Sequence, residues 1–150
     1  MAAASTTTSI INNWLKKGDK EKDNFNKFLC YWISFNCYYT SITGNPYDKQ
    51  ALDALKLYQP IEEPFKIMIE KHMIFFQNLL SVCPILDERI NPKPPLNFNE
   101  ITISNTIDIL YRVRCNLFHG NKDINDKRDI EVISVALPVL EMIAKTFNEI

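Results

Sequence analysis

FNKFLCYWISFNCYYTSIT, residues 25–43, is the stretch that decides the fold. Its large apolar side chains recur at alternating spacings of three and four residues, which places them on one face of an α-helix that packs in a bundle. A long, deeply buried helix is therefore expected over Asp19–Thr43, and the run Thr43-Gly44-Asn45-Pro46 should end it. The residues on its buried face are Phe25, Phe28, Trp32, Phe35, Tyr39 and Ile42.

Helical patterns also flank this stretch on both sides. Before it, residues 1–8 are polar and expected to be frayed, and a short helix around Ile10–Leu15 should stop at Gly18. After it, four prolines make a helix improbable between Cys83 and Asn99, so we expect one long loop there. The remaining helices are predicted over Tyr47–Tyr58, Glu62–Val82, Asn99–His119 and Asp126–Asn148, the last with a kink at Pro138.

These elements predict an all-α fold in a single domain spanning residues 1–150. Four main helices would form a bundle, with one or two short extra helices. Only three glycines are present, which argues against a turn-rich β architecture. His72 falls on the apolar side of the predicted 62–82 helix and is interpreted as a core or interface residue.

Charge and cysteine usage exclude several classes of protein. The net charge of −1 at pH 7 gives no overall signature of a nucleic-acid-binding protein and counts against RNA binding by the bulk surface, but it leaves a local site open. No cysteines form a CxxC pair and both histidines lie far from any cysteine cluster, so we expect no metal site, no cofactor and reduced, buried thiols. The cysteines are Cys30, Cys37, Cys83 and Cys115.

The first residues, MAAASTTTS, lack the basic and apolar segments of a secretory signal. No apolar run approaches the roughly 20 residues that a membrane-spanning helix needs. We therefore expect a cytoplasmic protein without membrane contact.

The chemistry-bearing stretch is YRVRCNLFHGNK, residues 111–122, which contains no acidic side chain. Arg114 falls on the apolar stripe between Leu110 and Leu117, so we expect it either at the edge of the core or in contact with an anion, a ligand or another subunit. His119 ends the predicted helix, and Gly120 is suited to cap it in the left-handed conformation. An imidazole that moves a proton and a cation that stabilises a phosphorane suit metal-independent phosphodiester cleavage.

Several other residues are candidate auxiliary or RNA-contacting groups, and structural alternatives remain open for some. Arg114 could instead pair with Asp108 or Glu141, while His119 merely caps the helix. Asn36 could hydrogen-bond across the bundle or face the cleft. The auxiliary set is Asn116, Lys122, Cys115, Arg112 and Asn36, with Lys127 and Arg128 either steering phosphates or forming an ordinary solvated face.

The Arg114-x-x-x-x-His119 arrangement near the end of the third main helix, with the flank LFHG and the aromatic helix YWISFN, resembles the HEPN superfamily (higher eukaryotes and prokaryotes nucleotide-binding). Many members have asparagine directly after the arginine, where this chain has Cys115, with Asn116 one place later. The resemblance implies a four-helix bundle of HEPN type and a metal-independent endoribonuclease. It also implies a homodimer whose composite site uses Arg114 and His119 of both chains, and a toxin or phage-defence role beside a nucleotidyltransferase-type antitoxin.

Two other classes of function compete with a ribonuclease. The same surface could belong to a non-catalytic helical module that binds a nucleotide, RNA or a protein, or the chain could be a purely structural four-helix oligomer. Glycine-rich phosphate loops, GxSxG, HExxH and paired-carboxylate metal patterns are absent from the sequence.

Overall fold

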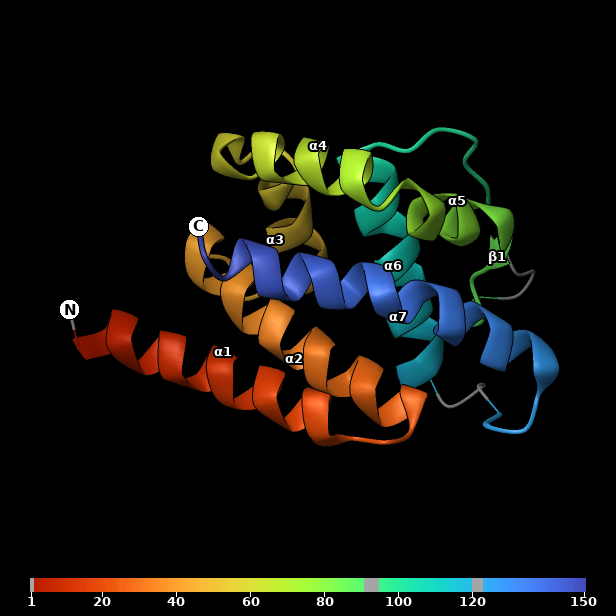
Figure 1. Cartoon of the computed structure of the whole chain (residues 1–150), viewed down its shortest axis with the longest axis horizontal. Helices are drawn as coiled ribbons and strands as arrows, with labels where there is room; N and C mark the ends of the chain where they lie inside the picture. The colour runs from red at the N-terminus through yellow and green to blue at the C-terminus, as the bar shows by residue number, and fades with distance from the viewer. Residues whose placement is uncertain (1, 91–94, 120–122) are drawn as a thin grey trace.

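The computed structural model describes residues 2–90, 95–119 and 123–150. Within these ranges the chain forms seven α-helices, one short 3-10 helix and one two-stranded hairpin (Figure 1), so the expectation of a mostly helical fold is confirmed. The elements are α1 Ala2–Lys20, α2 Asn24–Thr43, α3 Asp48–Leu55, η1 Gln59–Ile61, α4 Glu62–Lys71, α5 Met73–Ser81, β1 Ile85–Leu86, β2 Pro95–Leu96, α6 Ile103–Phe118 and α7 Lys127–Phe147.

The aromatic helix α2 lies at the centre and packs against α1, α3 and α7 (Figure 1). It starts later than predicted, because Asp23 caps it by accepting a 3.3 Å hydrogen bond from the Phe25 N–H. It ends where predicted: Gly44 adopts the left-handed conformation with φ 67°, and its N–H donates to the Thr40 carbonyl. Five of the six residues predicted on its inner face are buried, and Ile42 is exposed.

Helix α1 is longer than predicted at both ends. It begins at Ala2, inside the segment expected to be frayed, and continues through Gly18 to Lys20. The prediction that Gly18 stops this helix is therefore wrong, and close packing explains the glycine instead. A Cβ atom at this position would lie only 2.7 Å from Cε1 of Tyr31 on α2.

Substituting Gly18 with alanine should destabilise the protein by about 1–2 kcal/mol, because overpacking outweighs the better helix propensity of alanine. Tyr31 cannot easily move aside, since its hydroxyl lies 2.6 Å from an Asp19 oxygen and 3.2 Å from a Glu141 oxygen. Urea unfolding measures the effect, with Lys16→Ala on the exposed side of α1 as the control. A Gly18→Ala midpoint equal to or above that of the wild type would contradict the packing argument.

The predicted helix over 62–82 is two helices, α4 and α5, separated at His72. His72 has φ −131° and ψ 33°, outside helical values, and its side chain is exposed. Its placement in the core is therefore wrong, and a place in an interface stays a prediction. The break turns Phe76 and Leu79 inward and leaves Phe75 38% exposed. Phe76 packs edge-on against Phe65 of α4, with ring centroids 5.7 Å apart.

The predicted 83–99 loop contains the β1–β2 hairpin, in which Ile85 pairs with Leu96. Helix α6 then begins at Ile103 rather than Asn99, because Thr102 caps it by accepting a 3.0 Å bond from the Asn105 N–H. Helix α7 starts after its cap Asp126, close to the prediction, and remains helical through Pro138. None of the helices in the described ranges has the length and apolarity needed to cross a membrane.

Candidate functional site

Arg114 lies on α6, at the edge of the core. Its side chain is half-buried and forms an ion pair with an acidic residue. Its Nη2 is 3.1 Å from Oδ2 of Asp48 in the first turn of α3, and its guanidinium carbon lies 4.5 Å from the centre of the Phe118 ring. The structural alternative, in which Arg114 pairs with an acid, is therefore confirmed in kind. The two acids named for it were wrong, because Asp108 pairs with Lys56 and Glu141 with Lys145. Among the described residues, the buried Nε of Arg114 has no hydrogen-bond partner.

Phe118, the last residue of α6, is 46% exposed and does not lie in the core. Its ring instead forms a platform for the Arg114 guanidinium, a cation–π contact that keeps the long side chain in one orientation. The result is a cation with an aromatic support at the open end of α6.

Asp48 joins Arg114 to α2. Its Oδ1 accepts hydrogen bonds from Nδ2 of Asn36 at 2.6 Å and from the hydroxyl of Tyr39 at 2.8 Å. The interpretation of Asn36 as a hydrogen-bonding residue between helices is thus confirmed. Burial, more than these contacts, raises the pKa of Tyr39, so its phenol stays protonated and can donate. The sequence offered no signal for Asp48, because an acidic residue in the first turn of a helix is common.

His119 forms the C-cap of α6, and its backbone N–H donates to the Cys115 carbonyl at 3.0 Å. Its side chain is exposed. The expected cap at Gly120 and the candidate Lys122 lie outside the described residues. The imidazole is therefore exposed to solvent at the end of the helix, directly after Phe118 and five residues after Arg114.

Two of the predicted auxiliary residues, Asn116 and Arg112, contact the hairpin and not the end of α6 where His119 lies. Asn116 is fully buried, and its amide donates to the Leu86 carbonyl at 2.7 Å and accepts from the Glu88 N–H at 2.9 Å. Arg112 donates to the Ile85 carbonyl at 2.9 Å. Both side chains hold the loop onto α6, so we leave them out of the candidate site.

Cys115 is also buried, with 3% of its surface exposed. Its Sγ lies 3.9 Å from Nη1 of Arg114. Burial and a hydrogen bond to Cys115 raise the pKa of the neighbouring Tyr111. Cys115 is thus buried beside the arginine and does not face solvent.

The segment after β1 carries a second charged cluster. Arg89 makes two 2.9 Å hydrogen bonds to the carboxylate of Asp87, which is itself buried. These bonds hold the pKa of Asp87 below its usual value. Arg128, named as a candidate for steering phosphates, donates to the carbonyls of Val82 and Pro84. Both arginines are engaged in shaping the loop next to α6.

Comparison of the chain with protein-family models, with curated proteins and with solved structures finds no match. The resemblance to the HEPN superfamily therefore stays a prediction. Within the described ranges, no three His, Cys, Asp or Glu side chains gather as ligands for a metal ion.

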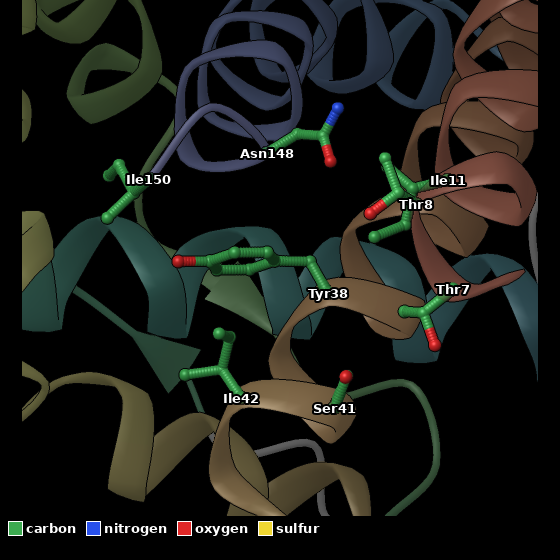
Figure 2. A pocket seen from close by; sticks show the side chains of 8 residues that line it. All are labelled: Thr7, Thr8, Ile11, Tyr38, Ser41, Ile42, Asn148 and Ile150. Carbon is green, nitrogen blue, oxygen red and sulfur yellow. The ribbon is translucent and has the colours of Figure 1, made fainter. Parts of the chain in front are cut away.

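A separate pocket of about 190 Å³ lies between α1, α2 and the C-terminal end of the chain (Figure 2). No charged side chain lines it, and α6 contributes none of its lining residues: Thr7, Thr8, Ile11, Tyr38, Ser41, Ile42, Asn148 and Ile150. Burial raises the pKa of Tyr38 to about 12, so its hydroxyl is neutral. Because no charged side chain lines it, this pocket does not suit a phosphate.

Proposed function

We propose that the chain is a metal-independent endoribonuclease of HEPN type, with Arg114 and His119 at the end of α6 as its reacting groups. The observation that carries the proposal is that Arg114 contacts Asp48 and Phe118 while His119, five residues further along the chain, is exposed. A cation held in place and an exposed imidazole suit the cleavage of RNA by its own 2′-hydroxyl.

In the proposed reaction, the 2′-oxygen attacks the adjacent phosphorus and the bond to the 5′-oxygen breaks. An imidazole removes the proton of the 2′-hydroxyl, and an acid protonates the leaving 5′-oxygen. The guanidinium of Arg114 stabilises the negative charge that grows on the phosphorane oxygens. The products are a 2′,3′-cyclic phosphate and a 5′-hydroxyl.

The attacking and leaving oxygens lie on opposite sides of the phosphorus. One imidazole in a fixed position therefore cannot easily take the proton from the first and give a proton to the second. A homodimer with twofold symmetry supplies a second His119 and a second Arg114 to the same cleft. Phe118 at the end of α6 and Ile124, six residues later, are 46% and 65% exposed and are available for such an interface.

The finer description of the fold belongs to this proposal. In a four-helix bundle of HEPN type, α2, α4 with α5, α6 and α7 would be the main helices, and α1 and α3 the additional ones. The cytoplasmic setting, the toxin or phage-defence role and a nucleotidyltransferase-type antitoxin follow from the same proposal.

A ribonuclease assay in EDTA tests it. The purified chain is expected to cleave a mixed panel of single-stranded and structured RNAs with chelator present, because no step needs a metal ion. The fragments should carry cyclic phosphate and 5′-hydroxyl ends, and a 2′-deoxy substitution at the cleaved position should block the reaction. Mass spectrometry of the fragments identifies the ends.

A dimeric chain that leaves the whole panel intact would overturn the proposed catalysis. The alternative is then a non-catalytic module that binds RNA, a nucleotide or a protein, and the Arg114–Asp48 ion pair favours it, since a carboxylate beside the arginine offsets part of its charge. Electrophoretic mobility shift with the uncut RNAs would detect RNA binding by this module.

A further inference from the structure

We infer that Asp48 is the positioning residue of Arg114, and that Asn36 and Tyr39 of α2 hold Asp48 in place for that role. The inference deepens the proposed function and rests on it where RNA is concerned, but its geometric part concerns the chain alone. It assigns a purpose to three polar side chains that the motif on α6 does not include.

The two oxygens of Asp48 have separate partners. Oδ1 accepts from Asn36 at 2.6 Å and from Tyr39 at 2.8 Å, while Oδ2 is 3.1 Å from Nη2 of Arg114. Asn36 Nδ2 also lies 2.8 Å from the Tyr39 hydroxyl, so the three polar groups on this side form a closed triangle. A carboxylate fixed at one oxygen can direct the other, and here the other points at the guanidinium.

Arg114 depends on this contact for its orientation. Among the described residues, Asp48 is the one carboxylate within ion-pair distance of it. The Phe118 ring covers one face of the guanidinium but does not fix its rotation within that plane. The Sγ of Cys115 is a weak hydrogen-bond partner and lies 3.9 Å from Nη1. The buried Nε has no partner, so it adds nothing that would hold the group if Asp48 were lost.

The surroundings also leave donors for a ligand. A guanidinium has five N–H groups, and the ion pair occupies one end of the fork. Arg114 can therefore keep Asp48 on Nη2 while Nη1 meets a phosphate oxygen. Without the Asp48 carboxylate, the positive charge of Arg114 would no longer be offset and would attract RNA more strongly, but the guanidinium would lose its alignment.

Asp48→Asn tests the inference because binding and turnover should then change in opposite senses. We expect kcat to fall by about 10- to 100-fold, since small misplacements of a reacting group have effects of that size. The Kd for a non-cleavable 2′-O-methyl RNA should stay equal or become tighter, because a negative charge is removed. Asp53→Asn is the matched control: Asp53 lies on the same helix but is exposed and pairs only with Lys49 and Lys56, among the described residues.

Asp48 could also matter for folding, so a gentler variant is needed. Tyr39→Phe removes one hydrogen bond to Oδ1 and leaves the carboxylate, and kcat should fall by about threefold to tenfold. Wild-type kcat in both Asp48→Asn and Tyr39→Phe, or a loss of RNA binding equal to the loss of turnover in Asp48→Asn, would overturn the inference.

A spectroscopic readout separates this inference from the proposed function. The ¹H–¹⁵N signal of the Arg114 Nε–H, assigned by its absence in Arg114→Lys, should shift and broaden in Asp48→Asn and stay in place in Asp53→Asn. If the wild type cleaves no RNA, the proposed function fails while this signal still reports on Asp48. An Arg114 signal that is the same in Asp48→Asn and the wild type would show that Asp48 does not position the arginine.

Discussion

Alanine in place of His119 is expected to lower the rate of RNA cleavage by about 10²- to 10⁴-fold, the range for loss of a general acid–base group. The fold should remain intact, because the His119 side chain is exposed and its helix-ending hydrogen bond comes from the backbone N–H. Single-turnover cleavage and thermal unfolding, measured on the same preparation, check the two halves of this expectation.

His72→Ala is the matched control, since His72 is the only other histidine and is likewise exposed. It should cleave RNA at the wild-type rate. Equal cleavage by His119→Ala and the wild type would remove the imidazole from the mechanism. An equal loss in His72→Ala would show that the assay responds to something other than the end of α6.

Replacing Trp32 with alanine should destabilise the protein by about 3–5 kcal/mol, the usual cost of removing a large aromatic side chain from a core. Trp32 is 1% exposed and lies against aromatic rings from its own helix and from α6. Denaturant unfolding followed by circular dichroism measures the change. The ring centroids nearest to that of Trp32 are those of Phe35 at 5.5 Å, Tyr39 at 6.1 Å, Phe28 at 6.3 Å and Tyr111 at 6.4 Å.

Trp32→Phe is the informative companion variant. The indole Nε1 of Trp32 is buried without a hydrogen-bond partner among the described residues, so its removal forfeits no hydrogen bond. Relief of an unsatisfied donor, worth about 1–3 kcal/mol, should offset part of the lost packing. Trp32→Phe should therefore lose less than half as much stability as Trp32→Ala. If Trp32→Phe and Trp32→Ala lost similar amounts of stability, the indole N–H would have a hydrogen-bond partner and the argument from an unsatisfied donor would fail.

Helix positions were predictable wherever the apolar spacing was long and regular, as in α2 and α7. The misplaced boundaries depended on three-dimensional contacts. Gly18 signals a helix end in a local pattern, but the observed reason for a glycine is the Tyr31 ring of a neighbouring helix. The apolar spacing of residues 62–82 likewise gave no sign of the break at His72. Its backbone angles are non-helical, but a histidine can occupy either conformation, so the residue type does not reveal the break.

At the site, the sequence could show that Arg114 needed a partner but not which one. Spacing along one helix carries no information about α3, so Asp48 became visible only in the fold. Asn116 shows the opposite error: its proximity to Arg114 in the sequence suggested a shared role, yet the helical rotation between them turns it toward the hairpin.

The way α6 holds the hairpin also bears on how the protein avoids self-association. Backbone groups of a short extended segment are a template on which a strand from another molecule can assemble. Here the carbonyls of Ile85 and Leu86 and the N–H of Glu88 are taken by side chains of Arg112 and Asn116. These backbone groups are not available to a strand of another molecule, so Arg112 and Asn116 protect this part of the hairpin against edge-to-edge association.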